Sequence, residues 1–148
     1  MRIILQRVNR GRVSVDGHTI AEIGLGLVIL LGVGPEDGDE QIDYLVKKIA
    51  NLRIFEDDEG KMNLSVLDVD GQAIVVSQFT LYADTRKGRR PSFTRAAPPE
   101  VANPLVDRFA ERLTAQGVPT QAGEFGAHMQ VEIHNDGPVT IWMEQGQR

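Results

Sequence analysis

The chain has 148 residues, a formal net charge of −5 and no cysteine. This length predicts one domain over residues 1–148 with a full hydrophobic core, and the lack of cysteine excludes disulfide frameworks and thiolate chemistry. The acidic balance argues against general coating of nucleic acid, and the longest apolar run, Gly24 to Gly34, is far shorter than the ~20 residues that a membrane span needs. We therefore expect a soluble, unprocessed protein in the reducing cytoplasm.

The beginning of the chain predicts a β-meander. Residues 2–8 and 12–15 have the composition of strands, and Asn9-Arg10-Gly11 joins them. Asp16-Gly17 is a tight-turn signal that leads to a third short strand around Ile20.

A buried strand and an amphipathic helix are predicted next. Residues 25–33 show no alternation, but their length and flanking glycines favour a strand buried on both faces over a short helix. The helix extends to about Leu52, with Asp37 as N-cap and Glu40 as its capping-box partner. Its apolar residues form one stripe that is expected to pack on a sheet: Ile42, Leu45, Val46, Ile49 and Leu52.

Polar side chains directly follow the β-branched run at residues 73–76, which predicts a second buried strand. Ser77, Gln78 and Thr80 surround Phe79, and the twofold period of a strand sends Ser77 and Phe79 to one face and the other two to the opposite face. An unpaired polar group at the end of a buried strand costs ~1–3 kcal/mol, so these residues need partners or a function.

A cluster of positive charge comes next, with no acidic residue between Asp84 and Glu100. Its five members are Arg86, Lys87, Arg89, Arg90 and Arg95. Because the rest of the chain is strongly acidic, this localised charge predicts a defined anionic ligand. The alternative is a solvated basic loop.

The last third predicts a helix followed by two strands. The helix is expected to begin with Asn103 as N-cap and Pro104 in its first turn and to end at Gly117, with one face formed by Leu105, Phe109 and Leu113. Residues 129–144 then form a strand, a turn at 135–138 and a second strand. The order of elements predicts an α+β fold with a predominantly β core.

The usual catalytic templates are missing from the sequence. It has no G-x-S-x-G elbow, no H-E-x-x-H pair, no P-loop and no dinucleotide fingerprint, and its histidines, His18, His128 and His134, are each isolated. The acidic run at residues 56–61 lacks the ligand spacing of an EF-hand and is expected to be a solvated, hairpin-like loop. Two features remain, the strand end at 77–80 and the segment 135–140, and each by itself fits an ordinary strand terminus or hairpin turn.

Together, however, the two segments are specific. SQFTLYADTRKGRRPSF and NDGPVT, in this order and in a chain of this size, closely resemble the D-aminoacyl-tRNA deacylase (D-tyrosyl-tRNA deacylase) family, and the agreement extends over nearly the whole chain. The resemblance implies a β-rich single domain with a barrel-like mixed sheet and two main helices. It also implies a homodimer that hydrolyses the ester joining a D-amino acid to the terminal adenosine of tRNA. No metal or other cofactor is expected, because the sequence has no cysteine and no paired histidine–carboxylate spacing.

The resemblance also implies roles for particular residues. Ser77, Gln78, Phe79 and Thr80 would line the active site, with backbone N–H donors near Phe79. Gly137 and Pro138 would form a cis unit that enters the site of the partner subunit and selects chirality. The basic cluster would meet tRNA phosphates.

Several alternatives stay open at the level of sequence. Thr80 either attacks the ester covalently or holds groups at the carbonyl while the ribose hydroxyl assists an attacking water, and the absence of a nearby base disfavours covalent attack. Glycyl-tRNA is a further expected substrate, since glycine has no side chain to exclude. The competing functions are a non-catalytic RNA-binding β module and a structural dimer without a ligand; few aromatic residues accompany the basic cluster, which weakens the first.

Overall fold

The computed structural model describes residues 1–146. Its main sheet has the order β2-β1-β3-β6-β7, with β8 paired to the other edge of β1. The strands of this sheet are β1 (Arg2–Val15), β2 (His18–Ile23), β3 (Gly26–Gly32), β6 (Gln72–Ser77), β7 (Thr120–Ala122) and β8 (Met129–Glu144). β4 (Phe55–Glu56) and β5 (Met62–Leu64) form a separate hairpin around the charged loop, as expected.

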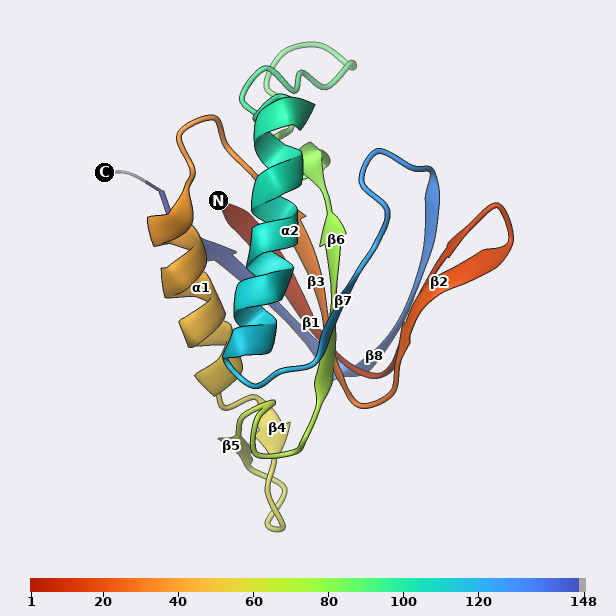
Figure 1. Cartoon of the computed structure of the whole chain (residues 1–148), viewed down its shortest axis with the longest axis vertical. Coiled ribbons are helices and arrows are strands. Elements are labelled where there is room, and N and C mark those ends of the chain that lie inside the picture. The colour runs from red at the N-terminus through yellow and green to blue at the C-terminus, as the bar shows by residue number, and fades with distance from the viewer. Residues whose placement is uncertain (147–148) are drawn as a thin grey trace.

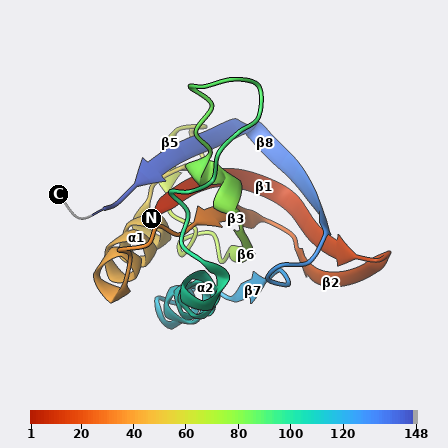
Figure 2. The same cartoon turned by 90° about the horizontal axis from the view of Figure 1, so that it is seen from above.

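Two helices, α1 (Asp39–Asn51) and α2 (Pro99–Ala115), cover one face of the sheet, whereas β8 curves along the other side of the molecule (Figures 1 and 2). Each helix connects two parallel neighbours, because α1 lies between β3 and β6 in the chain and α2 lies between β6 and β7. The predicted α+β fold with a mixed sheet is therefore confirmed.

The central strands are buried on both faces, as their continuous apolar runs indicate. In β3, Leu27 and Ile29 pack into the main core beneath the helices, and Val28 packs into a second core on the opposite face. In β6, Val75 likewise packs into the main core and Val76 into the second core. The two cores fix both faces of the strand that ends at the polar segment 77–80.

The sheet closes nearly into a barrel through one side chain. β2 and β7 are the two ends of the sheet order, and the Gln121 amide joins them. Its Oε1 accepts the Glu22 N–H at 3.0 Å and its Nε2 donates to the Glu22 carbonyl at 2.8 Å. One side chain thus supplies the donor and the acceptor that an adjacent strand would provide.

Two of the predicted turns are wrong because both chain segments continue as strands. β1 is unbroken through Asn9-Arg10-Gly11, where it changes partner from β3 to β2 while β8 stays paired along its other edge. β8 is likewise continuous, and residues 135–140 form a bulge in it instead of a hairpin turn. By contrast, the turn at Asp16-Gly17 is confirmed, with both residues at positive φ.

Both helix starts differ from the prediction. α1 has Gly38 as N-cap, with the Gln41 side chain accepting the Gly38 N–H at 2.8 Å, because the carboxylate of Asp37 instead accepts the Gly34 N–H. α2 begins at Pro99, so that Pro104 lies inside the helix. The end of α2 agrees with the prediction, since Gly117 adopts a φ of 104°.

Candidate active site

The segment after β6 turns away from the sheet. β6 ends at Ser77, and the Gln78 N–H still donates to the Leu31 carbonyl of β3 at 2.8 Å. Phe79 to Tyr82 then form a short 3₁₀ helix, η1. The predicted alternation of residues 77–80 between two faces of a strand is therefore wrong, because extended structure stops before Phe79.

The turn into η1 leaves two backbone N–H donors without an acceptor in the part of the chain that the structure describes. The N–H groups of Phe79 and Thr80 are the first of the 3₁₀ helix, and neither has an acceptor within residues 1–146. The hydroxyl of Thr80 accepts a hydrogen bond from the Gln78 side-chain amide and is exposed. The N–H donors expected near Phe79 are thus present.

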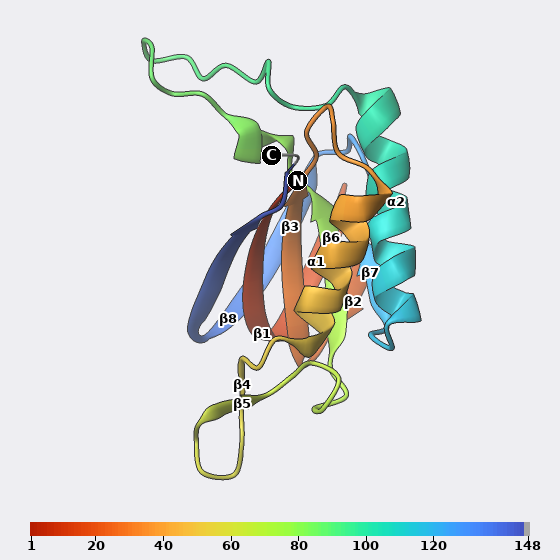
Figure 3. The same ribbon diagram turned by 90° about the vertical axis from the view of Figure 1, so that its left-hand side faces the viewer.

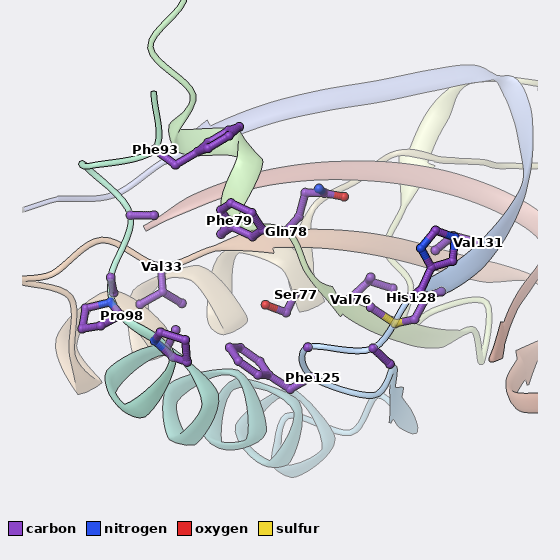
Figure 4. Close-up of a pocket in the computed structure, with 17 residues that line it drawn as sticks. Val33, Val76, Ser77, Gln78, Phe79, Phe93, Pro98, Phe125, His128 and Val131 are labelled. Carbon is purple, nitrogen blue, oxygen red and sulfur yellow. The ribbon is translucent and has the colours of Figure 1, made fainter. Parts of the chain in front are cut away.

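A cavity of about 630 Å³ lies beside these donors, at the end of the sheet between the two cores (Figure 4). Ser77 lies between Phe79 and Phe125 in this view, with His128 at the far side. Ser77, Gln78 and His128 carry the polar side chains among its lining residues, which otherwise are apolar. The cavity therefore suits a largely apolar ring system held by a few polar contacts.

Three of the four predicted site residues line this cavity, and Thr80 lies just outside it. The sequence analysis missed the opposite walls. One comes from residues 96–98 and the first turn of α2, and the other from residues 125–129, between β7 and the start of β8. Small residues, prolines and a lone histidine give no local signal of a binding site. They become a wall only through the packing of α2 and β7 next to β6.

The basic cluster lies on a loop that extends away from the body of the molecule (Figure 3), and Arg95 follows the base of this loop in the sequence. Asp84 and Ser92 close its base with two backbone hydrogen bonds of 2.7 and 3.0 Å. Phe93 then returns to the cavity, where its ring packs edge to face on Phe79 with centroids 5.1 Å apart. The loop is thereby attached directly to η1.

Arg86 differs from the other cations of the loop. Its guanidinium binds the Asp84 carboxylate through Nε at 2.9 Å and Nη2 at 2.6 Å. This side-chain hydrogen bonding holds the pKa of Asp84 well below its ordinary value, so the pair remains ionised at neutral pH. The four cations that are exposed without an ion pair within residues 1–146 are Lys87, Arg89, Arg90 and Arg95.

The Gly137-Pro138 bond is cis, which confirms the expectation from the resemblance. The Asn135 side chain supports the bulge, because its Oδ1 accepts the Val139 N–H at 3.0 Å and its Nδ2 donates to Thr140 Oγ1 at 2.8 Å. Gly137 has a φ of 131°, and a Cβ there would lie 3.1 Å from the Arg7 guanidinium.

Arg7, which the sequence analysis did not single out, holds the bulge from beneath. It is only 4% exposed; its Nε donates to the Asp136 carbonyl at 3.1 Å and its Nη1 to the Ile54 carbonyl at 2.8 Å. Its position in the sequence could have identified it, because Arg7 continues the alternating buried face of β1 formed by Ile3 and Leu5. A cation on an apolar face must have partners.

Within one chain, the bulge and the cavity lie at different levels of the sheet. Ser77, which lines the cavity, pairs with Leu31 of β3. Arg7, under the bulge, pairs with Leu27, four residues earlier in the same strand. Four residues along a strand correspond to about 13 Å. Gly137 and Pro138 accordingly do not line the cavity of their own chain.

Comparison with known proteins decides the family. The family model for D-Tyr-tRNA(Tyr) deacylase matches residues 4–144. The chain belongs to this family. The D-aminoacyl-tRNA deacylase of Thermomicrobium roseum is 58% identical over 147 residues, covering 99% of this chain and 96% of the relative. That of Limosilactobacillus reuteri is 52% identical, covering 98% of this chain and all of the relative.

Solved structures agree with this deacylase fold. The c-Myc DNA Unwinding Element Binding Protein superposes with a TM-score of 0.92 at 42% identity, covering 99% of this chain and 100% of that one. A probable eukaryotic D-amino acid tRNA deacylase superposes with a TM-score of 0.82 at 20% identity, covering 96% and 97%. The second likeness supports the near-barrel fold alone.

Two further findings concern the described part of the deacylase. No cluster of three or more His, Cys, Asp or Glu side chains within residues 1–146 has the arrangement to hold a metal ion. No helix in that range is long and apolar enough to cross a bilayer.

Proposed function

We propose that the cavity beside Ser77 and η1 is where this chain hydrolyses the ester of D-aminoacyl-tRNA, releasing a free D-amino acid and tRNA. The reaction itself, a proofreading step in translation, follows from membership of the deacylase family. The free N–H groups of Phe79 and Thr80 at the edge of an apolar cavity are the observation that supports this location. Because translation is the process served, the cytoplasm is the proposed compartment.

The two N–H groups are proposed to bind the oxyanion that forms as water attacks the ester carbonyl. An aminoacyl ester is activated, so positioned donors lower its barrier without a strong nucleophile. No carboxylate or imidazole within residues 1–146 hydrogen-bonds the Thr80 hydroxyl, which instead accepts the Gln78 amide. This arrangement favours attack by water, assisted by the substrate's ribose hydroxyl, over covalent attack by Thr80.

The basic loop is proposed to hold the phosphates of the acceptor end while the terminal aminoacyl-adenosine enters the cavity. Lys87, Arg89, Arg90 and Arg95 supply the exposed charge, whereas Arg86 orders the loop through Asp84. Phosphate contacts of this type give affinity and position without sequence readout. We propose tRNA as the nucleic-acid partner, not DNA.

Chiral selection is proposed to require a second copy of the chain. Since Gly137 and Pro138 lie too far along the sheet to reach their own cavity, they act in the cavity of the partner in a homodimer. A rigid backbone unit there excludes an L side chain by steric clash. A ~10³-fold preference for the D ester over the L ester needs a free-energy difference of only about 4 kcal/mol. Glycine has no side chain to clash with this unit, so glycyl-tRNA is also proposed as a substrate.

The deciding experiment compares hydrolysis of D-tyrosyl-tRNA and L-tyrosyl-tRNA by the purified protein. We expect turnover of the D ester and a discrimination on the order of 10³ against the L ester. An RNA-binding module would retain tRNA on a filter without hydrolysing either ester, and a structural dimer would do neither. Either of these results would remove the proposal.

A further inference from the structure

We infer that Arg2 is a positioning residue for this reaction: it holds the carboxyl end of η1 and so fixes the direction of the Phe79 and Thr80 N–H groups at the other end. The inference rests on the proposed function, because it assigns a catalytic task to those donors. Arg2 lies at the beginning of β1, far from η1 in the sequence, and no catalytic motif includes it.

The side chain of Arg2 contacts the last turn of η1 in two ways. Its Nη1 donates a hydrogen bond of 3.0 Å to the Leu81 carbonyl, and its Cζ lies 4.4 Å from the centre of the Tyr82 ring. Arg2 also contacts the neighbouring strand β8: its Nε donates to Glu144 Oε1 at 3.0 Å, and its Cζ lies 5.8 Å from the centre of the Trp142 ring. Arg2 therefore joins the end of η1 to two strands of the sheet.

η1 needs such an external support. It is a four-residue 3₁₀ helix, bounded by the Leu81 N–H to Gln78 carbonyl bond of 3.2 Å and the Ala83 N–H to Thr80 carbonyl bond of 3.0 Å. Helices this short have poor hydrogen-bond geometry and little stability of their own. Their orientation is set by tertiary contacts, and Arg2 supplies a cation at the carboxyl end, where the helix dipole favours one.

Arginine suits this position better than lysine. The planar guanidinium stacks on an aromatic ring while its N–H groups bond to a carbonyl and a carboxylate, and an ammonium group does not combine these geometries. Tyr82 is buried and reaches Asp37 through a long hydroxyl contact of 3.4 Å. Within residues 1–146, Arg2 thus makes the shorter of the two side-chain hydrogen bonds at this end of η1.

A positioning role predicts a specific kinetic signature. The N–H donors act on the charge that develops in the transition state, whereas tRNA affinity comes from the separate basic loop. Loss of Arg2 should therefore lower kcat and leave KM nearly unchanged. A displacement of about 1 Å in reacting groups lowers rates by roughly 100-fold, which sets the upper range of the effect.

The test uses Arg2→Met and Arg2→Lys with Arg12→Met as the matched control. Arg12 also lies in β1 and pairs across to β8, through Glu132, but it has no contact with η1. With D-tyrosyl-tRNA as substrate, we expect kcat to fall roughly 10- to 100-fold in Arg2→Met with KM within about twofold of wild type. Arg2→Lys should recover part of the loss, and Arg12→Met should retain the wild-type kcat.

The inference is overturned if Arg2→Met keeps the wild-type kcat or loses no more than Arg12→Met. Amide hydrogen exchange at Tyr82 and Ala83 supplies a readout that does not depend on activity: faster exchange is expected in Arg2→Met and not in Arg12→Met, and unchanged exchange rejects the inference. If Arg2→Met does not fold, Arg2→Lys is compared with Arg12→Lys in both measurements. An inactive wild-type protein would instead reject the proposed function. Amide exchange at Tyr82 and Ala83 would then test whether Arg2 holds η1.

Discussion

Thr80 carries two groups with separate tasks at the edge of the cavity. Its N–H is free to meet an oxyanion, whereas its hydroxyl is already oriented by the Gln78 amide. A hydroxyl that accepts one hydrogen bond still has its own proton to donate, so it is able to polarise a group at the carbonyl. The backbone contribution survives any side-chain substitution, which allows the two tasks to be separated by mutation.

We predict that Thr80→Ala lowers the turnover of D-tyrosyl-tRNA by roughly 10²–10³, the range for removal of one oxyanion-hole donor. Thr80→Ser should retain much of the activity, because it keeps the hydroxyl. Thr85→Ala is the control, since Thr85 is exposed on the basic loop. A wild-type rate in Thr80→Ala would limit the Thr80 hydroxyl to a structural role.

At the scale of elements, the closure of the sheet supports one wall of the cavity. β7 is three residues long and leads directly into the segment 125–129 that lines the cavity. Along its outer edge, the Gln121 amide joins β7 to β2. The position of this wall therefore depends on a side chain that mimics a strand.

We predict that Gln121→Met lowers the free energy of unfolding by about 1 kcal/mol, since the variant cannot form the two solvent-accessible hydrogen bonds to the Glu22 backbone. For a chain of this size, the corresponding fall in Tm is roughly 2–4 °C. Thermal unfolding of Gln130→Met is the comparison, because Gln130 is an exposed glutamine of β8. Equal melting temperatures for the two variants would show that the sheet closes without Gln121.

At the scale of the whole molecule, charge is separated by region. The chain has a net charge of −5, yet the loop that projects from the body of the molecule is strongly cationic (Figure 3). A second basic group, formed by Lys47 and Lys48 of α1, lies along a groove lined by Tyr44 and Arg53, away from the cavity. If the phosphates of the acceptor end bind the loop, tRNA affinity should depend on the cations of the loop and not on Lys47 and Lys48.

We predict that replacing Arg89 and Arg90 together with Ala weakens tRNA binding and reduces the dependence of log K on log salt by ~0.7–0.9 for each phosphate that the loop no longer neutralises. Preference for the D ester should not change. Binding is measured over a range of salt concentrations, and the pair Lys47→Ala and Lys48→Ala controls for net charge. If the lysine pair changes the slope and the arginine pair does not, the loop does not bind phosphate.

The limits of the sequence-based prediction have a common physical cause. Periodicity identified the buried strands and the amphipathic helices, because burial of a face is encoded locally. Asn9-Arg10-Gly11 and residues 135–138 were mistaken for turns, since only pairing with a distant strand keeps them extended. The cavity walls and Arg7 likewise depend on contacts between segments far apart in the chain.

The distance of the Gly137-Pro138 bulge from its own cavity has a genetic consequence. Under the proposal that each bulge serves the other copy, a chain carrying Thr80→Ala and a chain carrying Pro138→Ala each form homodimers with two defective sites. In a mixed pair, one site combines both defects and the other combines an intact cavity with an intact bulge. Two defective alleles expressed together would then complement each other, which a site built within one chain does not permit.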